Sequence, residues 1–181
     1  MNAALRLSWY KFKHHYMDFV KVLLGIVAFE GLILYIQDKG FLKDFETTRM
    51  TLFLLLFSTS LLIVVQNSIY ISKERSVLNR DFFSGLSRSA FALASMGIHA
   101  FFAVLETIVF ILSYSVFSKF FDKEFPDAGH IFGSYRWEVG ITVLLVFLAS
   151  HFIALFISAL VGKSEITSVI LAVVVGIMQF S

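Results

Sequence analysis

Long runs of apolar residues constrain this chain more than any other feature. The segment from Met50 to Ser72 contains no acidic or basic residue. A helix needs about 20 mostly apolar residues to cross the roughly 30 Å hydrocarbon core of a bilayer. The composition agrees, because 58% of the residues are hydrophobic and only 15% are charged, whereas about 25% are charged in a soluble domain. The sequence therefore predicts an integral membrane protein with an all-α fold.

The apolar runs predict a single transmembrane domain that covers residues 1–181. Its five predicted spans are residues 19–37, 50–72, 90–118, 139–161 and 166–181. The last of these would reach only about 24 Å, at about 1.5 Å per residue. We therefore expect the fifth span to be truncated and the chain to be part of a longer protein.

Residues 1–18 precede the first span and are amphipathic. Leu5, Trp9 and Phe12 follow the spacing of one helix face, while basic residues lie off that face. This pattern predicts a helix that lies in the membrane interface. With the N-terminus inside, more Lys and Arg residues flank the spans on the cytoplasmic side than on the outer side. The positive-inside rule thus favours a cytoplasmic N-terminus, in the inner or plasma membrane of the cell.

The segment 73–89, between the second and third spans, is charged but also rich in apolar residues. Val77, Leu78 and Phe82 would lie on one face of a helix. Gly85 suits the turn that ends such a helix. The pattern predicts a short amphipathic helix that docks a partner on the cytoplasmic side. An interfacial helix that rests on lipid headgroups explains the same pattern.

Polar residues inside the spans are the candidates for chemistry. His99 and Glu106 are seven residues apart and share a face of the third span, and His151 on the fourth span could approach either. No pair of ligands has the spacing typical of a metal site, so we predict no metal and no catalytic residue. The preferred interpretation is a buried polar network that joins the helices by hydrogen bonds. Its predicted members are Glu30, His99, Glu106 and His151.

The second span also carries Phe, hydroxyl and amide residues that could line a path for an amphipathic substrate. These candidates are Phe53, Phe57, Thr59, Ser60, Gln66 and Asn67. Ordinary helix packing explains them equally well. The sequence contains no P-loop, dinucleotide fingerprint or nucleophile elbow. If the protein depends on ATP, another polypeptide or a further domain must bind it.

The charged segment carries a distinctive pattern after the second span. In order, it reads Glu74-Arg75, Asn79-Arg80-Asp81, Gly85, Ser87 and Ala90-Phe91. Together with the N-terminal amphipathic helix and two preceding spans, this order of elements resembles the membrane domain of type-2 ABC exporters, the fold of the G-type ABC transporters. Asp81 stands where Glu is more usual in that family. Ser95-Met96 stands where the family has a small residue followed by Lys.

The resemblance implies six spans, of which the sixth would be missing here, and a cytoplasmic coupling helix that seats on an ATPase. The residues implied to form this coupling site are Glu74, Arg75, Arg80, Asp81, Phe82, Phe83, Gly85 and Leu86. The charged members would hold the helix by salt bridges, and the aromatic members would enter a groove of the ATPase. The implied partners are an ABC ATPase subunit or domain, a second membrane domain in a homo- or heterodimer, and membrane lipids, but no nucleic acid. ATP and Mg²⁺ would be bound by the ATPase and not by this chain.

The resemblance implies the permease subunit of an ATP-driven exporter. This subunit would move an amphipathic, lipid-linked or hydrophobic substrate out of the cytoplasm and would not be an enzyme by itself. Two alternatives stay open from the sequence. One is a non-transporting membrane scaffold or assembly protein whose cytoplasmic helix binds another partner. The other is an intramembrane enzyme that uses His99, Glu106 and His151.

Overall fold

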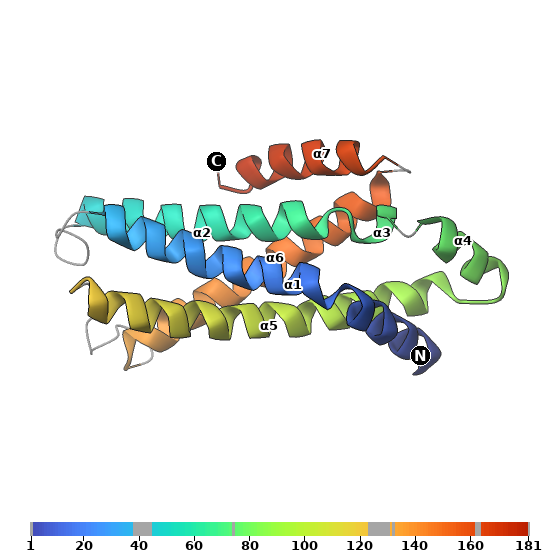
Figure 1. Cartoon of the computed structure of the whole chain (residues 1–181), viewed down its shortest axis with the longest axis horizontal. Helices are drawn as coiled ribbons and strands as arrows, with labels where there is room; N and C mark the ends of the chain where they lie inside the picture. The colour runs from blue at the N-terminus through green and yellow to red at the C-terminus, as the bar shows by residue number, and fades with distance from the viewer. Residues whose placement is uncertain are drawn as a thin grey trace.

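The computed structural model describes residues 2–37, 45–73, 75–122, 131, 133–161 and 164–180. Within these residues all regular secondary structure is helical. The helices are α1 Asn2–Ile36, α2 Phe45–Asn67, α3 Tyr70–Lys73, α4 Arg75–Phe83, α5 Arg88–Phe120, α6 Tyr135–Leu160 and α7 Glu165–Met178. The N-terminal end of α1 and the short helix α4 lie at one end of the molecule (Figure 1). The start of α2 and the end of α5 lie at the opposite end.

Four helices are long and apolar enough to cross a membrane, which confirms an all-helical membrane fold. These candidate spans are Tyr16–Ile36, Phe45–Ser72, Arg88–Phe120 and Tyr135–Leu160. The fifth predicted span corresponds to α7, whose helix is shorter at 14 residues. In Figure 1, α7 lies along the outside of the bundle, where it packs mainly on α2. A crossing by α7 stays a prediction.

The predicted interfacial helix and first span form one continuous helix, α1. No glycine or proline occurs before Gly25, so nothing in the sequence interrupts helical hydrogen bonding. Helices α2 and α6 also begin a few residues before the predicted spans. Their first turns contain Glu46 and Glu138, which stabilise a helix N-terminus through the helix dipole. The apolar runs therefore predicted the spans but underestimated the helices.

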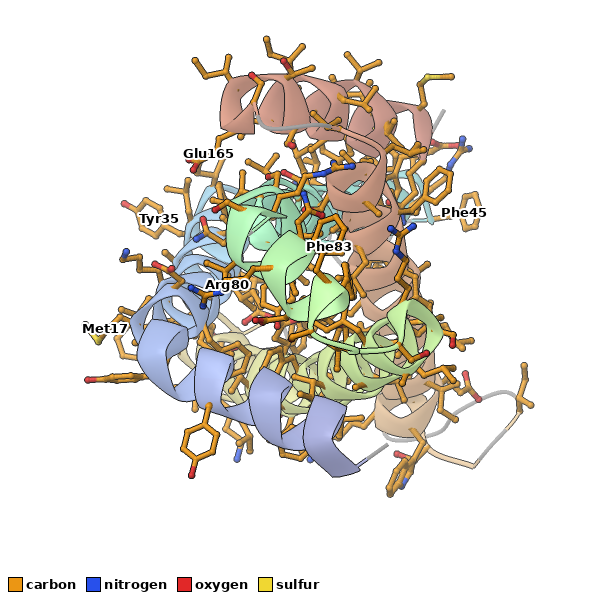
Figure 2. All side chains as sticks on the ribbon, turned by 90° about the vertical axis from the view of Figure 1, so that its right-hand side faces the viewer. Met17, Tyr35, Phe45, Arg80, Phe83 and Glu165 are labelled. Atoms are coloured by element: carbon orange, nitrogen blue, oxygen red, sulfur yellow. The ribbon has the colours of Figure 1, made fainter. Side chains whose placement is uncertain are left out.

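A capped turn separates the end of helix α4 from helix α5. At its end, Gly85 has a φ of +105°, a conformation that glycine adopts without strain. The Gly85 and Leu86 amides donate to the carbonyls of Phe82 and Asp81, which is the Schellman arrangement. Helix α5 then begins at the cap residue Ser87, whose hydroxyl accepts from the Ala90 amide. Figure 2 shows α4 at the end of the molecule that faces the viewer.

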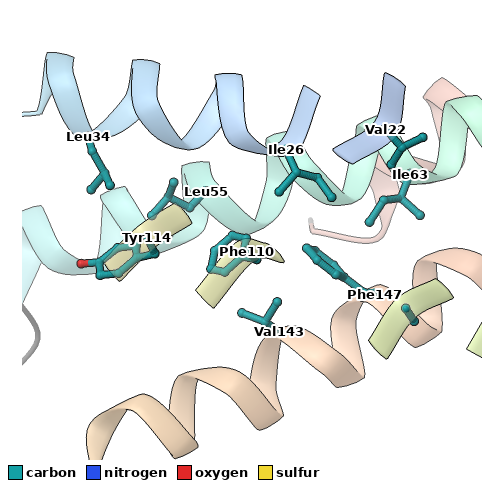
Figure 3. Packing of buried hydrophobic residues seen from close by; sticks show 10 residues of the cluster. Val22, Ile26, Leu34, Leu55, Ile63, Phe110, Tyr114, Val143 and Phe147 are labelled. Atoms are coloured by element: carbon teal, nitrogen blue, oxygen red, sulfur yellow. The ribbon is translucent and has the colours of Figure 1, made fainter. Parts of the chain in front are cut away.

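The main hydrophobic core lies between α1, α2, α5 and α6. Ile26 of α1, Leu55 and Ile63 of α2, Phe110 of α5 and Phe147 of α6 are almost completely buried there (Figure 3). Many large apolar side chains on the outer faces of the same helices are exposed. An apolar exterior around a packed interior suits a bundle that is surrounded by lipid.

Candidate functional site

A buried chain of polar side chains joins α5 to α6. The Nδ1 atoms of His99 and His151 lie 3.0 Å apart, and Nε2 of His151 lies 2.7 Å from Oε2 of Glu106. All three side chains are at most 1% exposed. The ring centroids of Tyr70 and His99 lie 4.9 Å apart, and the two rings are nearly perpendicular. We call His99, His151 and Glu106 the polar triad.

The hydrogen bonds of the polar triad have a direction. When Glu106 is ionised it can only accept, and Nε2–H of His151 then donates to it. With neutral imidazoles, Nδ1 of His151 then accepts from Nδ1–H of His99. This arrangement leaves Nε2 of His99 and Oε1 of Glu106 buried without a hydrogen-bond partner among the described residues. The ring nitrogens of His151 are both used within the triad. In the part of the chain that the structure describes, no group of three or more His, Cys, Asp or Glu side chains, the polar triad included, has the arrangement of a metal site.

Glu30, the fourth predicted member of the buried polar network, lies apart from the polar triad. Its Oε2 accepts a hydrogen bond from the Ser113 hydroxyl, which joins α1 to α5. Glu30 is fully buried, and its Oε1 has no hydrogen-bond partner among the described residues. Ser113 was not identified from the sequence, although it follows Glu106 by seven residues and so shares its face of α5.

The candidates for a substrate path on α2 do not share one surface. The rings of Phe53 and Phe57 stack at 5.7 Å, and the ring of Phe180 packs edge-on against both. Ser60 instead faces α6, where its hydroxyl lies 2.6 Å from that of Ser150. Thr59 is fully buried and donates to the carbonyl of the preceding turn.

The remaining path candidates stand near the end of α2. The side-chain amide of Asn67 donates to the carbonyl of Ile63 at 2.9 Å, and Gln66 is partly buried. The aromatic pair therefore forms an outer surface, whereas Thr59 and Ser60 belong to the helix contacts inside the bundle.

The predicted coupling residues divide into an inner and an outer group. Phe82 packs edge-on against Phe91 of α5 at 5.9 Å, and the guanidinium of Arg88 lies over its ring. Phe83 is 93% exposed, and Figure 2 shows it with Arg80 on the end of the molecule. Only Phe83 of the two aromatic residues is therefore freely presented to a partner. Glu74 lies outside the described residues.

Hydrogen bonds and burial hold α4 and α3 against α6. Arg75 donates from Nη1 to the carbonyl of Val161 at 2.7 Å, and Leu78 is 2% exposed. The hydroxyl of Ser158 accepts from the amides of Ile71 and Ser72, at 2.8 and 3.1 Å. A side chain of α6 thus caps the first turn of α3.

Among the described residues, no salt bridge holds α4, and the salt bridges that the resemblance implies, which include Glu74, stay a prediction. Arg75, Arg80 and Asp81 form no ion pair with any described residue. Arg80 is exposed, and Asp81 contributes its backbone carbonyl to the turn that ends the helix. The described contacts of α4 with the bundle are a hydrogen bond to a backbone carbonyl and apolar packing.

Comparison with known proteins gives one family. A family model described as ABC2_membrane, ABC-2 type transporter, matches residues 6–181. The matched range includes nearly all of α1 and every later helix. No curated protein and no solved structure matches the chain.

Proposed function

The chain belongs to the ABC-2 type transporter family as its membrane domain, and on this premise we propose that it is the permease subunit of an ATP-driven exporter. The exported substrate is amphipathic, lipid-linked or hydrophobic. The N-terminus and α4 lie on the cytoplasmic side, in the inner or plasma membrane. An ABC ATPase subunit or domain binds ATP and Mg²⁺, and a second membrane domain completes the transporter.

One observation carries the proposal. Helix α4 is bonded to the bundle along one face and presents Phe83 on another, at the end of the molecule. An exposed phenylalanine gains about 1.5–3 kcal/mol when a partner buries it, so Phe83 is an anchor for the ATPase. Arg80 and Asp81 stand on the same short helix and set the orientation of that contact.

The contacts of α4 supply a mechanical connection to the spans. A displacement of α4 reaches α6 through Arg75 and the Val161 carbonyl, at 2.7 Å. It reaches α5 through the packing of Phe82 on Phe91. The polar triad then joins α5 to α6 deeper in the bundle. ATP-driven movement of α4 therefore shifts α5 and α6 together.

The proposed substrate surface is the outer face of α2 that carries Phe53 and Phe57. Phe53 is 42% exposed, and Phe180 covers the pair only from one side. Apolar rings at this position suit an apolar substrate that moves between two membrane domains. In this proposal helix α7 crosses the membrane as a fifth span.

The polar triad serves as a helix connection in this proposal and not as an active site. Its three side chains are at most 1% exposed, so no substrate reaches them in this conformation. Removal of one member would leave its partner buried without that hydrogen bond, which makes the connection costly to disrupt.

Purification of the full-length protein in mild detergent tests the proposed function. We expect a P-loop ATPase, bound or fused, in stoichiometric amount, together with vanadate-sensitive ATP hydrolysis. Reconstituted vesicles should then move an apolar substrate only when ATP is present. A stable complex with a different protein and without ATP turnover would instead identify a scaffold.

A further inference from the structure

A pocket lies between α4 and the bundle, with a volume of about 340 Å³. Its polar lining comes from Arg75, Asn79 and Arg88, and its apolar lining includes Phe82 and Phe91. An engineered apolar cavity of about 150 Å³ holds a benzene molecule. This space, which we call the α4 pocket, is therefore large enough for a small organic group.

The α4 pocket is lined by one face of α4. Arg75, Leu78, Asn79 and Phe82 follow the spacing of that face and line the pocket. Arg80 is exposed and does not line it. Phe83 also stays outside and faces the end of the molecule. The pocket is thus distinct from the surface that we assign to the ATPase.

The depth of the α4 pocket matches the level where three candidate spans end. Ile71 lies one residue before the end of the span Phe45–Ser72, and Arg88 begins the third span. Ala159, which also lines the pocket, lies one residue before the end of the fourth span. Lipid headgroups occupy this level of a membrane.

The polar side of the α4 pocket carries positive charge and several N–H groups that are available to bind a ligand. Arg75 uses one N–H on the Val161 carbonyl, and a guanidinium has five. Arg88 lies with its guanidinium 5.6 Å from the centre of the Phe82 ring and forms no ion pair with any described residue. Arg88 is also the first residue of α5, where the helix dipole adds positive potential.

We propose that the α4 pocket binds the headgroup phosphate of an anionic membrane phospholipid. Arg75 and Arg88 hold the phosphate from two sides, since guanidinium and phosphate form strong paired hydrogen bonds. Asn79 donates a further hydrogen bond. Phe82 and Phe91 pack against the glycerol and the first methylene groups of the acyl chains. A soluble anion would leave this apolar side without contact.

The bound lipid has a mechanical role because it lies beneath α4. It fills the space between α4 and the ends of α5 and α6, and so adds to the direct contacts that connect α4 to the bundle. The fraction of anionic lipid in the membrane then determines how strongly a displacement of α4 is transmitted to α5 and α6. This role adds to the proposed function, but the binding of the lipid does not depend on that function.

Lipid binding is tested on the full chain in nanodiscs of phosphatidylcholine with increasing phosphatidylglycerol. After transfer to mild detergent, mass spectrometry counts the phospholipids that stay bound. We expect wild type to retain phosphatidylglycerol over phosphatidylcholine. The double variant Arg75→Gln, Arg88→Gln should lose this preference by about tenfold or more, because each basic residue near anionic lipid contributes to binding. Arg80→Gln is the matched control, since it removes the same charge from α4 outside the pocket.

Three results would overturn the proposal. One is an unchanged preference in the double variant, and another is an equal loss in Arg80→Gln, which would indicate general surface charge. The third is displacement of the lipid by millimolar inorganic phosphate, which would indicate a soluble anion. If the double variant does not fold, Arg88→Gln alone carries the test, because the described contact of Arg88 with Phe82 is at the surface. Arg88→Gln should still lower the preference for phosphatidylglycerol over phosphatidylcholine severalfold.

Discussion

His99 of α5 and His151 of α6 lie with their Nδ1 atoms 3.0 Å apart, inside a bundle that excludes solvent from both. A direct imidazole pair needs one ring to donate and the other to accept. Glu106 enforces this arrangement by taking the second nitrogen of His151. The two helices are thus joined in one register, since a shift of α6 by one residue would separate His151 from both His99 and Glu106.

Removal of His151 should destabilise the protein more than a change that preserves its hydrogen bond. His151→Ala leaves His99 and Glu106 buried without their partner, which costs about 1–3 kcal/mol, plus the cost of the cavity. Glu106→Gln keeps an oxygen that accepts from His151 and should cost less. Thermal unfolding in detergent measures both. Equal unfolding temperatures for the two variants would show that the hydrogen bonds of His151 contribute no more than the charge of Glu106.

The two neighbouring phenylalanines of α4 should give different phenotypes. Phe83→Ala should leave the unfolding temperature unchanged but weaken ATPase binding about tenfold or more, because the side chain is 93% exposed and gains its burial from the partner. Phe82→Ala should lower the stability of the subunit, because its ring packs on Phe91. Binding is measured by titration of the purified ATPase. Unchanged binding in Phe83→Ala would remove Phe83 from the interface.

Ser158→Ala should loosen α3 from α6. The hydroxyl of Ser158 accepts from two backbone amides, and its loss leaves them buried at a cost of about 1–3 kcal/mol. Ser115→Ala is the matched control, since its hydroxyl bonds only to a carbonyl of its own helix. Amide hydrogen exchange at residues 70–73 should rise in Ser158→Ala alone. A similar rise in the control would show that the cap on α3 is not responsible.

Glu30 and Ser113 should be energetically coupled. Ser113→Ala removes the hydroxyl that donates to Glu30 and should destabilise the wild-type protein by about 1 kcal/mol or more. In a Glu30→Leu background the same change should have little effect, since no carboxylate then needs a donor. A double-mutant cycle on the free energy of unfolding measures the coupling. Additive effects would show that the contact contributes nothing.

The sequence predicted the spans because each is an apolar run with a charged boundary. It also placed His99 and Glu106 on one face, because seven residues are close to two helical turns. It could not assign partners between helices, since the register of α1 and α6 against α5 depends on packing of the whole bundle. For that reason Glu30 was grouped with the polar triad, whereas it pairs with Ser113.

In the coupling segment too, the sequence predicted local structure but not the contacts between helices. The position of Gly85 was sufficient to predict the turn at the end of α4, because glycine satisfies a local backbone requirement there. The roles of Phe82 and Phe83 could not be distinguished from the sequence, because two adjacent and identical side chains suit a buried and an exposed position equally well. Only the packing of Phe91 against one of them distinguishes the two.

Helix α5 has 33 residues and begins at the α4 pocket. At about 1.5 Å per residue it is a rod of about 50 Å. A tilt of about 5° around its midpoint would displace each end by about 2 Å in opposite directions. A small inward movement of Arg88 is therefore accompanied by an outward movement of Phe120 on the far side of the membrane. In the proposed transporter, one unbroken helix would thus link movements of opposite direction at the two surfaces of the membrane.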